Sequence, residues 1–278
     1  MNENTRELQM LELNILKIFV DICDKHGFRY YLSEGTLLGA IRHGGFIPWD
    51  DDVDVSMPRP DYERFSIIAK KELPEYLFLL DYKSADANSI DLFTVNKLYD
   101  NRQKIIWTYN GKSEATNPWI DIMPLDGLPD NVILRTLQII KKELGYKLFR
   151  IAQLGRIDIE LESRTIRKVL LAVLKMIHAD KLFNTQKRLI SINKCLQKYP
   201  FDQSPLAYNA FSEYKTITKQ NCYGDGRVIE FEGIRMKIPQ NYEEILKTEY
   251  GDYMKLPPVD QQKSKHNVKI LDKESETF

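Results

Sequence analysis

Four aspartates stand within five residues of one another: Asp50, Asp51, Asp52 and Asp54. The last two alternate with Val53 and Val55. Successive side chains of a β-strand point to opposite faces, so both valines can enter a core while the carboxylates of Asp52 and Asp54 share the other face. Two carboxylates about 4 Å apart repel by roughly 4 kcal/mol at an effective dielectric of about 20. A fold that keeps both ionised therefore needs a cation beside them, and hard oxygen ligands favour Mg²⁺.

A solvated acidic turn is the ordinary alternative to a strand at this cluster. The valine alternation and the apolar flank Phe46–Trp49 favour the strand. A calcium-binding EF-hand loop is a second alternative, but the glycine at its sixth position and the glutamate at its twelfth are missing. The cluster therefore predicts a carboxylate site built on a strand.

The charge balance and the cysteines limit the remaining classes of protein. The 278 residues include 40 Lys or Arg and 40 Asp or Glu, so the basic excess of most nucleic-acid-binding proteins is missing. We therefore expect no nucleic-acid partner. The 3 cysteines have no metal-ligand spacing, which is typical of reduced thiols in a cytoplasmic protein. No apolar run has the length of a signal peptide or a membrane span.

Hydrophobic periodicity predicts an α/β fold with a mixed sheet. Apolar residues recur at three- and four-residue steps in four predicted helices: Thr5–His26, Thr36–His43, Asp61–Leu73 and Tyr242–Tyr250. Shorter apolar or alternating runs predict these strands: Phe28–Leu32, Asp52–Met57, Tyr76–Tyr82, Phe93–Tyr99, Lys104–Tyr109, Trp119–Met123 and Gly233–Pro239. Residues 131–199 are expected to be mostly helical.

A glycine turn precedes the acidic strand. Gly35 and Thr36 stand where a predicted strand enters a short helix. Backbone N–H groups at a helix start can bind phosphate oxygens, and the hydroxyl of Thr36 adds a further donor. A glycine at a turn is by itself a weak signal. Combined with two alternating aspartates some sixteen residues later, it indicates a site for a phosphorylated ligand.

This pairing resembles the polymerase-β-type nucleotidyltransferase superfamily, and within it the chain resembles the LicD family. The resemblance is carried by four segments: EGTLLGAIRHGGFIPWDDDVDV (Glu34–Val55), MPRPDYERF (Met57–Phe65), WIDIMPLDGLP (Trp119–Pro129) and IPQNYEEILKTEYGDYMKLPP (Ile238–Pro258). His266 follows these segments and also matches the family pattern, but the sequence assigns it no role. The resemblance covers both ends of the chain and about half its length, whereas residues 131–227 carry no matching motif.

The resemblance implies a nucleotidyltransferase-like core with a helical elaboration. We expect the catalytic core over residues 1–130 and a C-terminal segment over residues 227–278 that packs back on it. Residues 131–226 are expected to form a basic, mostly helical insertion or acceptor-side region. Within it, residues 131–200 carry 15 Lys or Arg against 5 Asp or Glu, a net charge of +10.

The activity implied by the resemblance is metal-dependent transfer of phosphocholine, or a related phospho-alcohol, from CDP-choline or a similar CDP-alcohol. The acceptor is a sugar hydroxyl of a cell-surface glycan precursor, such as teichoic acid or lipopolysaccharide, and it is expected to be lipid-linked. The eukaryotic relatives fukutin and fukutin-related protein act with CDP-ribitol. The sequence does not select the donor alcohol, and choline would call for aromatic faces around its quaternary ammonium.

Sites of this superfamily have three carboxylates and two divalent metals, here two Mg²⁺ ions with Mn²⁺ as the alternative. Asp52 and Asp54 match the first two carboxylates, and Asp121 in WIDIMP fits the third. All three are expected to ligate metal and to be catalytic, with Asp121 also accepting the proton of the attacking hydroxyl. Asp126 is the second choice for the third carboxylate, but because it follows Pro124 we expect it in a turn.

The remaining predicted site residues are contacts to the phosphates of the donor. They are Gly35, Thr36, Arg42, His43 and Lys97. Arg42 and His43 follow the glycine-turn helix, where ordinary surface charge is the alternative. Lys97 lies in a predicted strand, where a lysine is usually exposed at an edge.

The basic helical region has two interpretations. Residues 164–198 place Ile166, Leu170, Leu174 and Ile177 at helical spacing, with lysines and arginines between them. This pattern fits an amphipathic helix packed on the core with a solvated basic face. It also fits a surface that docks an anionic lipid-linked glycan or the inner face of the membrane, which is a peripheral association.

Two other functions stay open at this point. One is a nucleotidyltransferase that moves a nucleoside monophosphate to a small molecule or a protein, with the same metal chemistry and a different product. The other is a non-catalytic glycan- or metal-binding protein on the same fold, against which the complete set of three carboxylates argues.

Overall fold

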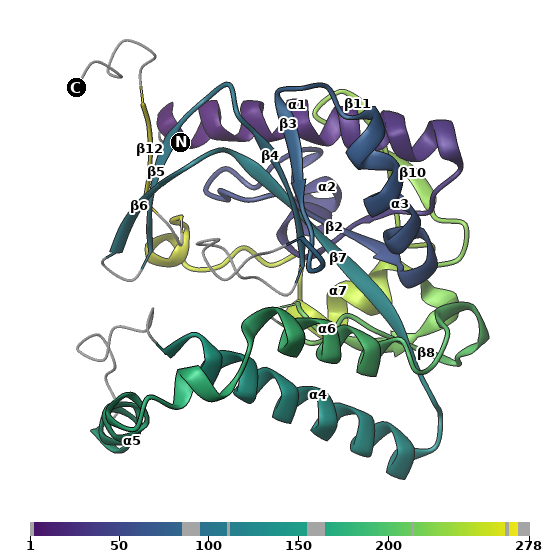
Figure 1. The fold of residues 1–278 in the computed structure, drawn as a ribbon. Helices are drawn as coiled ribbons and strands as arrows, with labels where there is room; N and C mark the ends of the chain where they lie inside the picture. The colour runs from purple at the N-terminus through teal and green to yellow at the C-terminus, as the bar shows by residue number, and fades with distance from the viewer. Residues whose placement is uncertain are drawn as a thin grey trace.

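The computed structural model describes residues 3–84, 95–109, 112–154, 165–212, 214–264 and 267–271. Its main sheet has the strand order β1 (Tyr31–Leu32), β2 (Asp54–Pro58), β7 (Trp119–Leu128), β4 (Asn96–Asp100) and β3 (Leu77–Leu80). β2 and β7 run parallel, whereas the other neighbours in this order are antiparallel. The predicted α/β fold with a mixed sheet is therefore confirmed (Figure 1).

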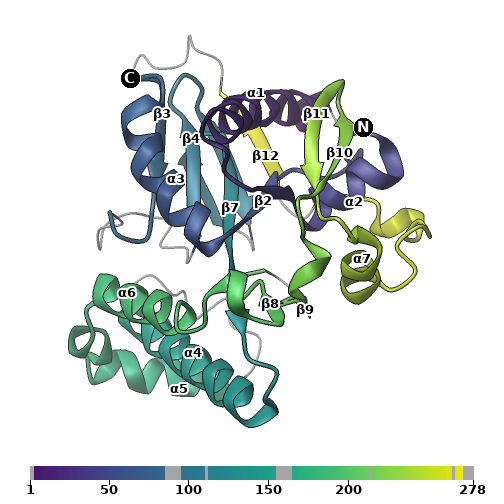
Figure 2. The ribbon, with the colours of Figure 1, turned by 90° about the vertical axis from the view of Figure 1, so that its right-hand side faces the viewer.

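Helices enclose the core of this sheet. α1 (Glu3–His26) and α3 (Arg59–Glu72) contact each other, and both contact β7 (Figure 2). The rings of Phe19 on α1 and Phe65 on α3 meet edge to face, with 5.0 Å between their centroids. α2 (Glu34–His43) contacts β2 and α7 (Tyr242–Tyr250). Residue Gly27, at a φ of +64°, ends α1 at the position that the sequence predicts.

Smaller elements surround the main sheet. β12 (Asn267–Ile270), β5 (Ile105–Tyr109) and β6 (Lys112–Thr116) form an antiparallel sheet, and β10 (Arg227–Phe231) pairs with β11 (Ile234–Ile238). β8 (Leu206–Tyr208) and β9 (Ile217–Lys219) belong to the main sheet, because β8 pairs with the end of β7 and β9 pairs with β8. The described part of the chain also contains the short 3₁₀ helices η2 (Ala179–Leu182), η3 (Phe201–Gln203), η4 (Gln220–Cys222) and η5 (Val259–Gln261).

A helical layer lies beside this core. α4 (Val132–Ala152) packs along α6 (Thr185–Leu196), and α5 (Thr165–Met176) contacts η2. Both ribbon views show these three helices gathered below the sheet. Among the described residues, no helix combines the length and the apolar character that crossing a bilayer requires. The division of the chain at residues 130 and 226 stays a prediction.

Several predicted strand boundaries differ from the structure. β2 begins at Asp54, so Asp52 precedes the strand, and β1 covers only Tyr31–Leu32. β7 continues through Pro124 to Leu128, which makes the predicted turn at Asp126 wrong. Pro124 is tolerated because it falls between the pairing with β4, which ends at Ile122, and the pairing with β8, which begins at Asp126.

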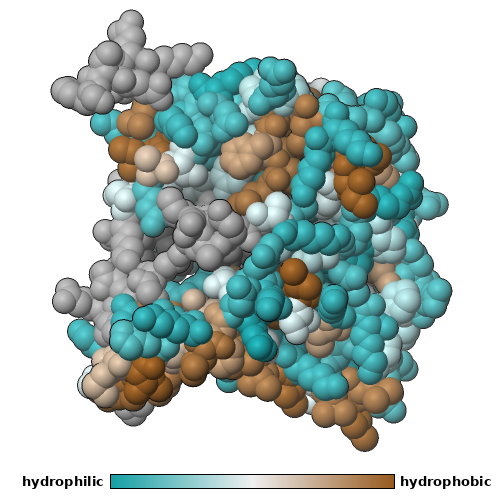
Figure 3. Space-filling view, in the orientation of Figure 1, coloured by the Kyte–Doolittle hydropathy of each residue, from teal (hydrophilic) through white to brown (hydrophobic). Residues whose placement is uncertain are grey.

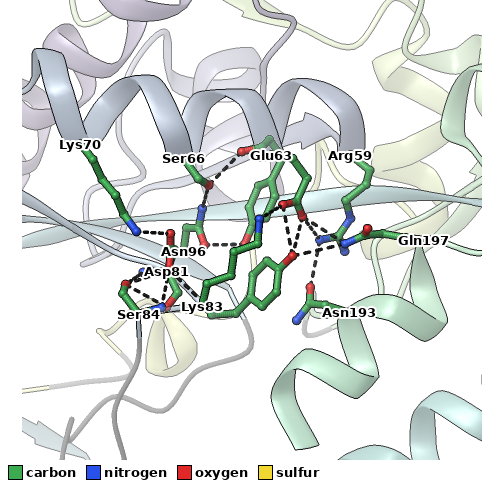
Figure 4. Close-up of polar contacts among 12 residues, drawn as sticks. Arg59, Glu63, Ser66, Lys70, Asp81, Lys83, Ser84, Asn96, Asn193 and Gln197 are labelled. Atoms are coloured by element: carbon green, nitrogen blue, oxygen red, sulfur yellow. Dashed lines mark hydrogen bonds and ion pairs between the residues drawn. The ribbon is translucent and has the colours of Figure 1, made fainter. Parts of the chain in front are cut away.

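A buried ion pair fixes the helical layer to the sheet. Arg59 donates from Nε and Nη2 to the two carboxylate oxygens of Asp126, each at 2.7 Å. Its Nη1 donates to Asn193 Oδ1 of α6 at 2.9 Å. Glu63, one turn along α3, accepts at 3.1 Å from Gln197, which directly follows α6 (Figure 4). Three elements, α3, β7 and α6, thus meet at one guanidinium group.

Replacing Asp126 by Asn should strongly destabilise the protein, because it removes the buried carboxylate that accepts two hydrogen bonds from Arg59 and leaves only Glu63, 3.3 Å from Nη1, as a counter-charge. We expect a loss of about 3–5 kcal/mol in the free energy of unfolding, measured by urea denaturation. Asp202→Asn is the matched control, since Asp202 pairs with Arg29 in a half-exposed position. That variant should lose less than about 1 kcal/mol. Equal losses in the two variants would contradict the role given to burial.

Candidate active site

A cavity of about 550 Å³ lies between α2, the segment of residues 47–54 and the segment of residues 250–263. Its acidic lining residues are Glu34, Asp50, Asp52, Asp54 and Asp252. Its aromatic lining residues are Trp49, Tyr214, Tyr250 and Tyr253. Cationic side chains also line it, among them Arg42. Negative charge and aromatic rings therefore share one cavity.

Asp54 and Asp121 lie side by side on neighbouring strands. They are register partners in the parallel pair of β2 and β7. The N–H of Asp121 donates to the carbonyl of Val53 at 2.8 Å, and the N–H of Ser33 donates to the carbonyl of Asp54 at 3.1 Å. Asp54 is buried and lines the cavity, whereas Asp121 is partly exposed and is not a lining residue.

The electrostatics of Asp54 set it apart from an ordinary carboxylate. Burial raises its pKa well above the usual value, and the carboxylates of Asp52, Glu34, Asp121 and Asp50 raise the pKa further, in that order. Strongly raised pKa values of this origin cluster at functional sites. These neighbours come from α2, from the segment before β2 and from β7, so negative charges from three parts of the chain act on Asp54.

A second group of carboxylates precedes β2. Oxygens of Asp50, Asp51 and Asp52 lie within 4.8 Å of one another, which suits a shared cation. Asp51 is buried, and its carboxylate accepts a hydrogen bond from the Ser264 hydroxyl at 2.5 Å. Asp52 belongs to this group and also raises the pKa of Asp54. It therefore connects the two sets of acidic side chains.

Lys97 occupies a central strand and not an exposed edge. β4 lies between β7 and β3, and Lys97 is only 3% exposed. Its Nζ lies 3.1 Å from Asp121 Oδ1 and 4.2 Å from the centroid of the Trp119 ring. The lysine therefore holds Asp121 in place from the side opposite Asp54.

Gly35 and Thr36 position the acidic segments. A Cβ atom on Gly35 would stand 2.4 Å from Asp50 Oδ2, so only glycine lets this carboxylate approach the first turn of α2. A negative charge is favoured at a helix start. Thr36 is buried, and its Oγ1 accepts from the backbone N–H of Asp54 at 2.9 Å. These contacts fix α2 to the beginning of β2.

Arg42 lines the cavity, whereas His43 does not. The Nη1 of Arg42 donates to the carbonyl of Tyr253 at 3.1 Å, and its Nε is buried without a hydrogen-bond partner among the described residues. Burial lowers the pKa of Arg42. His43 is exposed at the end of α2, where its ring meets Trp49 at 6.2 Å between centroids. Burial, followed by the Arg42 charge, lowers the pKa of His43.

Comparison with known proteins identifies the family. Residues 27–126 match the nucleotidyltransferase domain described as LicD/FKTN/FKRP. The chain is also similar to the lipopolysaccharide cholinephosphotransferase LicD of Haemophilus influenzae, with 33% identity over 94% of this chain and 95% of that protein. The chain belongs to the LicD family. Similarity of this extent covers the core, the helical layer and the C-terminal segment together.

Other relatives of this LicD-family chain match shorter segments. The human ribitol 5-phosphate transferase FKRP is 53% identical over 38 residues, which are 14% of this chain and 8% of that protein. An uncharacterized protein of Rickettsia prowazekii is 31% identical over 101 residues, or 34% of this chain and 35% of that protein. The predicted family is therefore confirmed. The predicted His266 lies outside the described residues.

Glu12 and Gln9 of α1 are site neighbours that the sequence interpretation missed. Glu12 is buried beside the cluster, and burial followed by the charges of Asp52 and Asp51 raises its pKa well above the usual value. Gln9 Nε2 donates to the carbonyl of Asp50 at 2.8 Å. A signal existed, because Glu12 falls four residues after Leu8 on the apolar face of the predicted helix.

The tyrosines of the cavity had no comparable local signal. Tyr214 and Tyr250 are far from the acidic segment in sequence, and their rings meet with 4.9 Å between centroids.

Glu249 precedes Tyr250 and accepts from the Thr216 hydroxyl at 2.7 Å, while its Oε2 is buried without a hydrogen-bond partner among the described residues. Burial raises the pKa of Glu249 to about 7.

Glu249 should make the stability of the protein depend on pH. Because its pKa is higher in the folded state, the folded protein binds this proton more tightly than the unfolded chain does. The resulting stabilisation is complete below the unfolded pKa of about 4.5 and is lost as the pH rises through about 7. From pH 5 to pH 8, wild-type protein should lose about 2 kcal/mol relative to Glu249→Gln in urea denaturation. This account would be contradicted if the difference in unfolding free energy between wild type and Glu249→Gln did not change with pH.

Proposed function

We propose that this LicD-family protein transfers phosphocholine from CDP-choline to a sugar hydroxyl of a lipopolysaccharide-type glycan. The observation that carries the proposal is the shared cavity, in which Asp52 and Asp54 stand near a set of aromatic rings. Similarity over nearly the whole of both chains to a lipopolysaccharide cholinephosphotransferase supports it. Teichoic acid is the alternative acceptor.

The aromatic lining supports a donor that carries choline. A quaternary ammonium is attracted to the faces of Trp and Tyr rings. Tyr214 and Tyr250 form a tilted pair in the lining, and Trp49 and Tyr253 line the same cavity. Asp252 adds a negative charge that favours a cation. We assign these rings to the trimethylammonium group.

The acidic residues fit a divalent cation. Asp54 is buried among several carboxylates whose charges raise its pKa, so a bound cation would relieve a repulsion that the fold otherwise retains. Carboxylate oxygens are the ligands that Mg²⁺ prefers. We assign Asp52, Asp54 and Asp121 as ligands of two Mg²⁺ ions, with Mn²⁺ as the alternative. Such ions would neutralise the charge that develops on the phosphate oxygens during transfer.

The protein itself orients the reactants and moves one proton. Arg42 lines the cavity with an unpartnered Nε and is the proposed contact of the donor phosphates. Lys97 keeps Asp121 beside Asp54. We assign Asp121, which is partly exposed beside Asp54 but does not line the cavity, as the acceptor of the proton of the attacking hydroxyl, whose oxygen bonds to the phosphorus attached to choline. The bond from that phosphorus to the bridging oxygen breaks, and CMP leaves.

Mg²⁺ should raise the melting temperature of the wild-type protein, because a ligand that binds only the folded state stabilises it. Asp54→Asn should lose this rise. In metal-free buffer containing a chelator, however, the same variant should melt at the wild-type temperature or above it, because one buried carboxylate is removed from the cluster. Differential scanning fluorimetry measures both effects. An undiminished Mg²⁺ response in Asp54→Asn would refute the ligand assignment.

Among CDP-choline, CDP-ribitol, CDP-glycerol and CTP, each with Mg²⁺, CDP-choline should raise the melting temperature most. Tyr214→Leu should weaken CDP-choline binding about 5- to 30-fold relative to CDP-glycerol, because a cation–π contact contributes about 1–2 kcal/mol. Tyr214→Phe is the matched control, since it keeps the ring and should keep the preference. If Tyr214→Leu lost the same factor of affinity for CDP-choline and for CDP-glycerol, a choline-specific role of Tyr214 would be excluded.

The nucleotidyltransferase alternative has one observation in its favour, the match of residues 27–126 to a nucleotidyltransferase domain. The product distinguishes the two reactions. Phosphocholine transfer from CDP-choline releases CMP, whereas transfer of a nucleoside monophosphate from CTP releases pyrophosphate. Release of neither product with a glycan acceptor present would favour a non-catalytic binding protein on this fold.

A further inference from the structure

α4 exposes apolar side chains along the face that points away from the core. Ile133, Leu137, Ile140 and Leu144 follow one another at steps of four, three and four residues, so they form one stripe along the helix. All four are exposed, and Ile133 reaches 71%. The space-filling view shows apolar residues gathered along the lower edge of the molecule, over α4 and α5 (Figure 3).

The inward face of α4 is already packed: Phe149 is buried in the core, Ile139 and Tyr146 pack against it, and two polar residues are buried beside them. Gln138 and Lys142 are buried against the neighbouring elements. Gln138 Nε2 donates to the carbonyl of Leu196 in α6 at 3.4 Å, and Lys142 Nζ donates to the carbonyl of Ala210 at 2.7 Å. The apolar stripe is therefore not needed to pack α4 on α6.

α5 continues this apolar surface. Val169, Leu170 and Val173 are exposed, and Met176 at the end of the helix is 73% exposed. The alternative of an amphipathic helix whose apolar face packs on the core is therefore wrong for Leu170 and for Ile177, which is also exposed. Exposed apolar surface that is contiguous and bordered by polar residues marks an interaction site.

The charge around the stripe selects the kind of partner. Residues 131–200 contain 15 Lys or Arg against 5 Asp or Glu. At about 3.6 residues per turn, the exposed Lys141 and Lys147 fall on either side of the α4 stripe. A second copy of this chain would bring the same positive charge against it and be repelled. An anionic bilayer offers both negative headgroups and an apolar layer beneath them.

We propose that the outward face of α4 and α5 binds the surface of an anionic lipid bilayer, with the apolar stripe inserted at the headgroup boundary. None of these residues lines the cavity, so the inference does not depend on the transfer reaction. Docking by this face would hold the cavity near acceptors that are anchored in the same bilayer.

The full-length protein should co-sediment with vesicles of phosphatidylcholine and phosphatidylglycerol at a 70:30 ratio, and at least tenfold less with phosphatidylcholine alone. Ile140→Asp should reduce binding to the anionic vesicles at least tenfold. Ile67→Asp on α3 is the matched control, because Ile67 and Ile140 are both 56% exposed. Lys141→Glu combined with Lys147→Glu should reduce the preference for anionic vesicles.

Far-UV circular dichroism and the CDP-choline melting shift, measured on the same preparations, separate this inference from the proposed function. Ile140→Asp should keep the fold and the wild-type response to the nucleotide while losing vesicle binding. No sedimentation with anionic vesicles, or equal effects of Ile140→Asp and Ile67→Asp, would overturn the proposal. The proposal would also be overturned if the wild-type protein does not bind vesicles but forms a dimer, detected by light scattering, that Ile140→Asp dissociates.

Discussion

Repulsion among buried carboxylates is the constraint around which this structure is organised. The parallel pairing of β2 and β7 places Asp54 beside Asp121, and the segment before β2 adds Asp50 and Asp52. Burial and these charges together raise the pKa of Asp54. The fold holds this arrangement with backbone contacts from Thr36 and Ser33 and with the ion pair between Lys97 and Asp121. A site with this excess of negative charge is suited to a cation.

β7 shows how the surroundings of a carboxylate decide its role. Asp126 lies on the same strand as Asp121, but both of its oxygens accept from the Arg59 guanidinium. Its charge is paired with Arg59 inside the protein, so it serves to fix α3 and α6 to the sheet. Asp121 faces one lysine and several like charges, so its surroundings leave negative charge for a ligand to neutralise.

The helical layer of α4, α5 and α6 differs from the core in how its apolar and polar side chains are placed. Its inner contacts use the apolar side chains of Phe149, Ile139 and Tyr146 together with the polar groups of Gln138 and Lys142. Its outer surface carries isoleucine and leucine between lysines. A helix of a water-soluble protein usually has one apolar stripe, which faces the core, whereas α4 has a second apolar stripe that faces solvent. The outer surface of the layer is therefore suited to an amphipathic partner, whereas the cavity lies in the core.

The sequence by itself determined the class of fold, the family and most of the elements, because periodicity and short motifs depend on neighbouring residues. Alternation at Val53 and Val55 predicted a strand near Asp54, and the steps through Leu8 and Ile15 predicted α1. The tertiary structure alone decided that Asp126 continues a strand and is paired with Arg59. It alone brought Glu12, Tyr214 and Tyr250 to the acidic segment and left an apolar stripe of α4 exposed to solvent. Those outcomes depend on contacts between segments far apart in the chain, which no local pattern encodes.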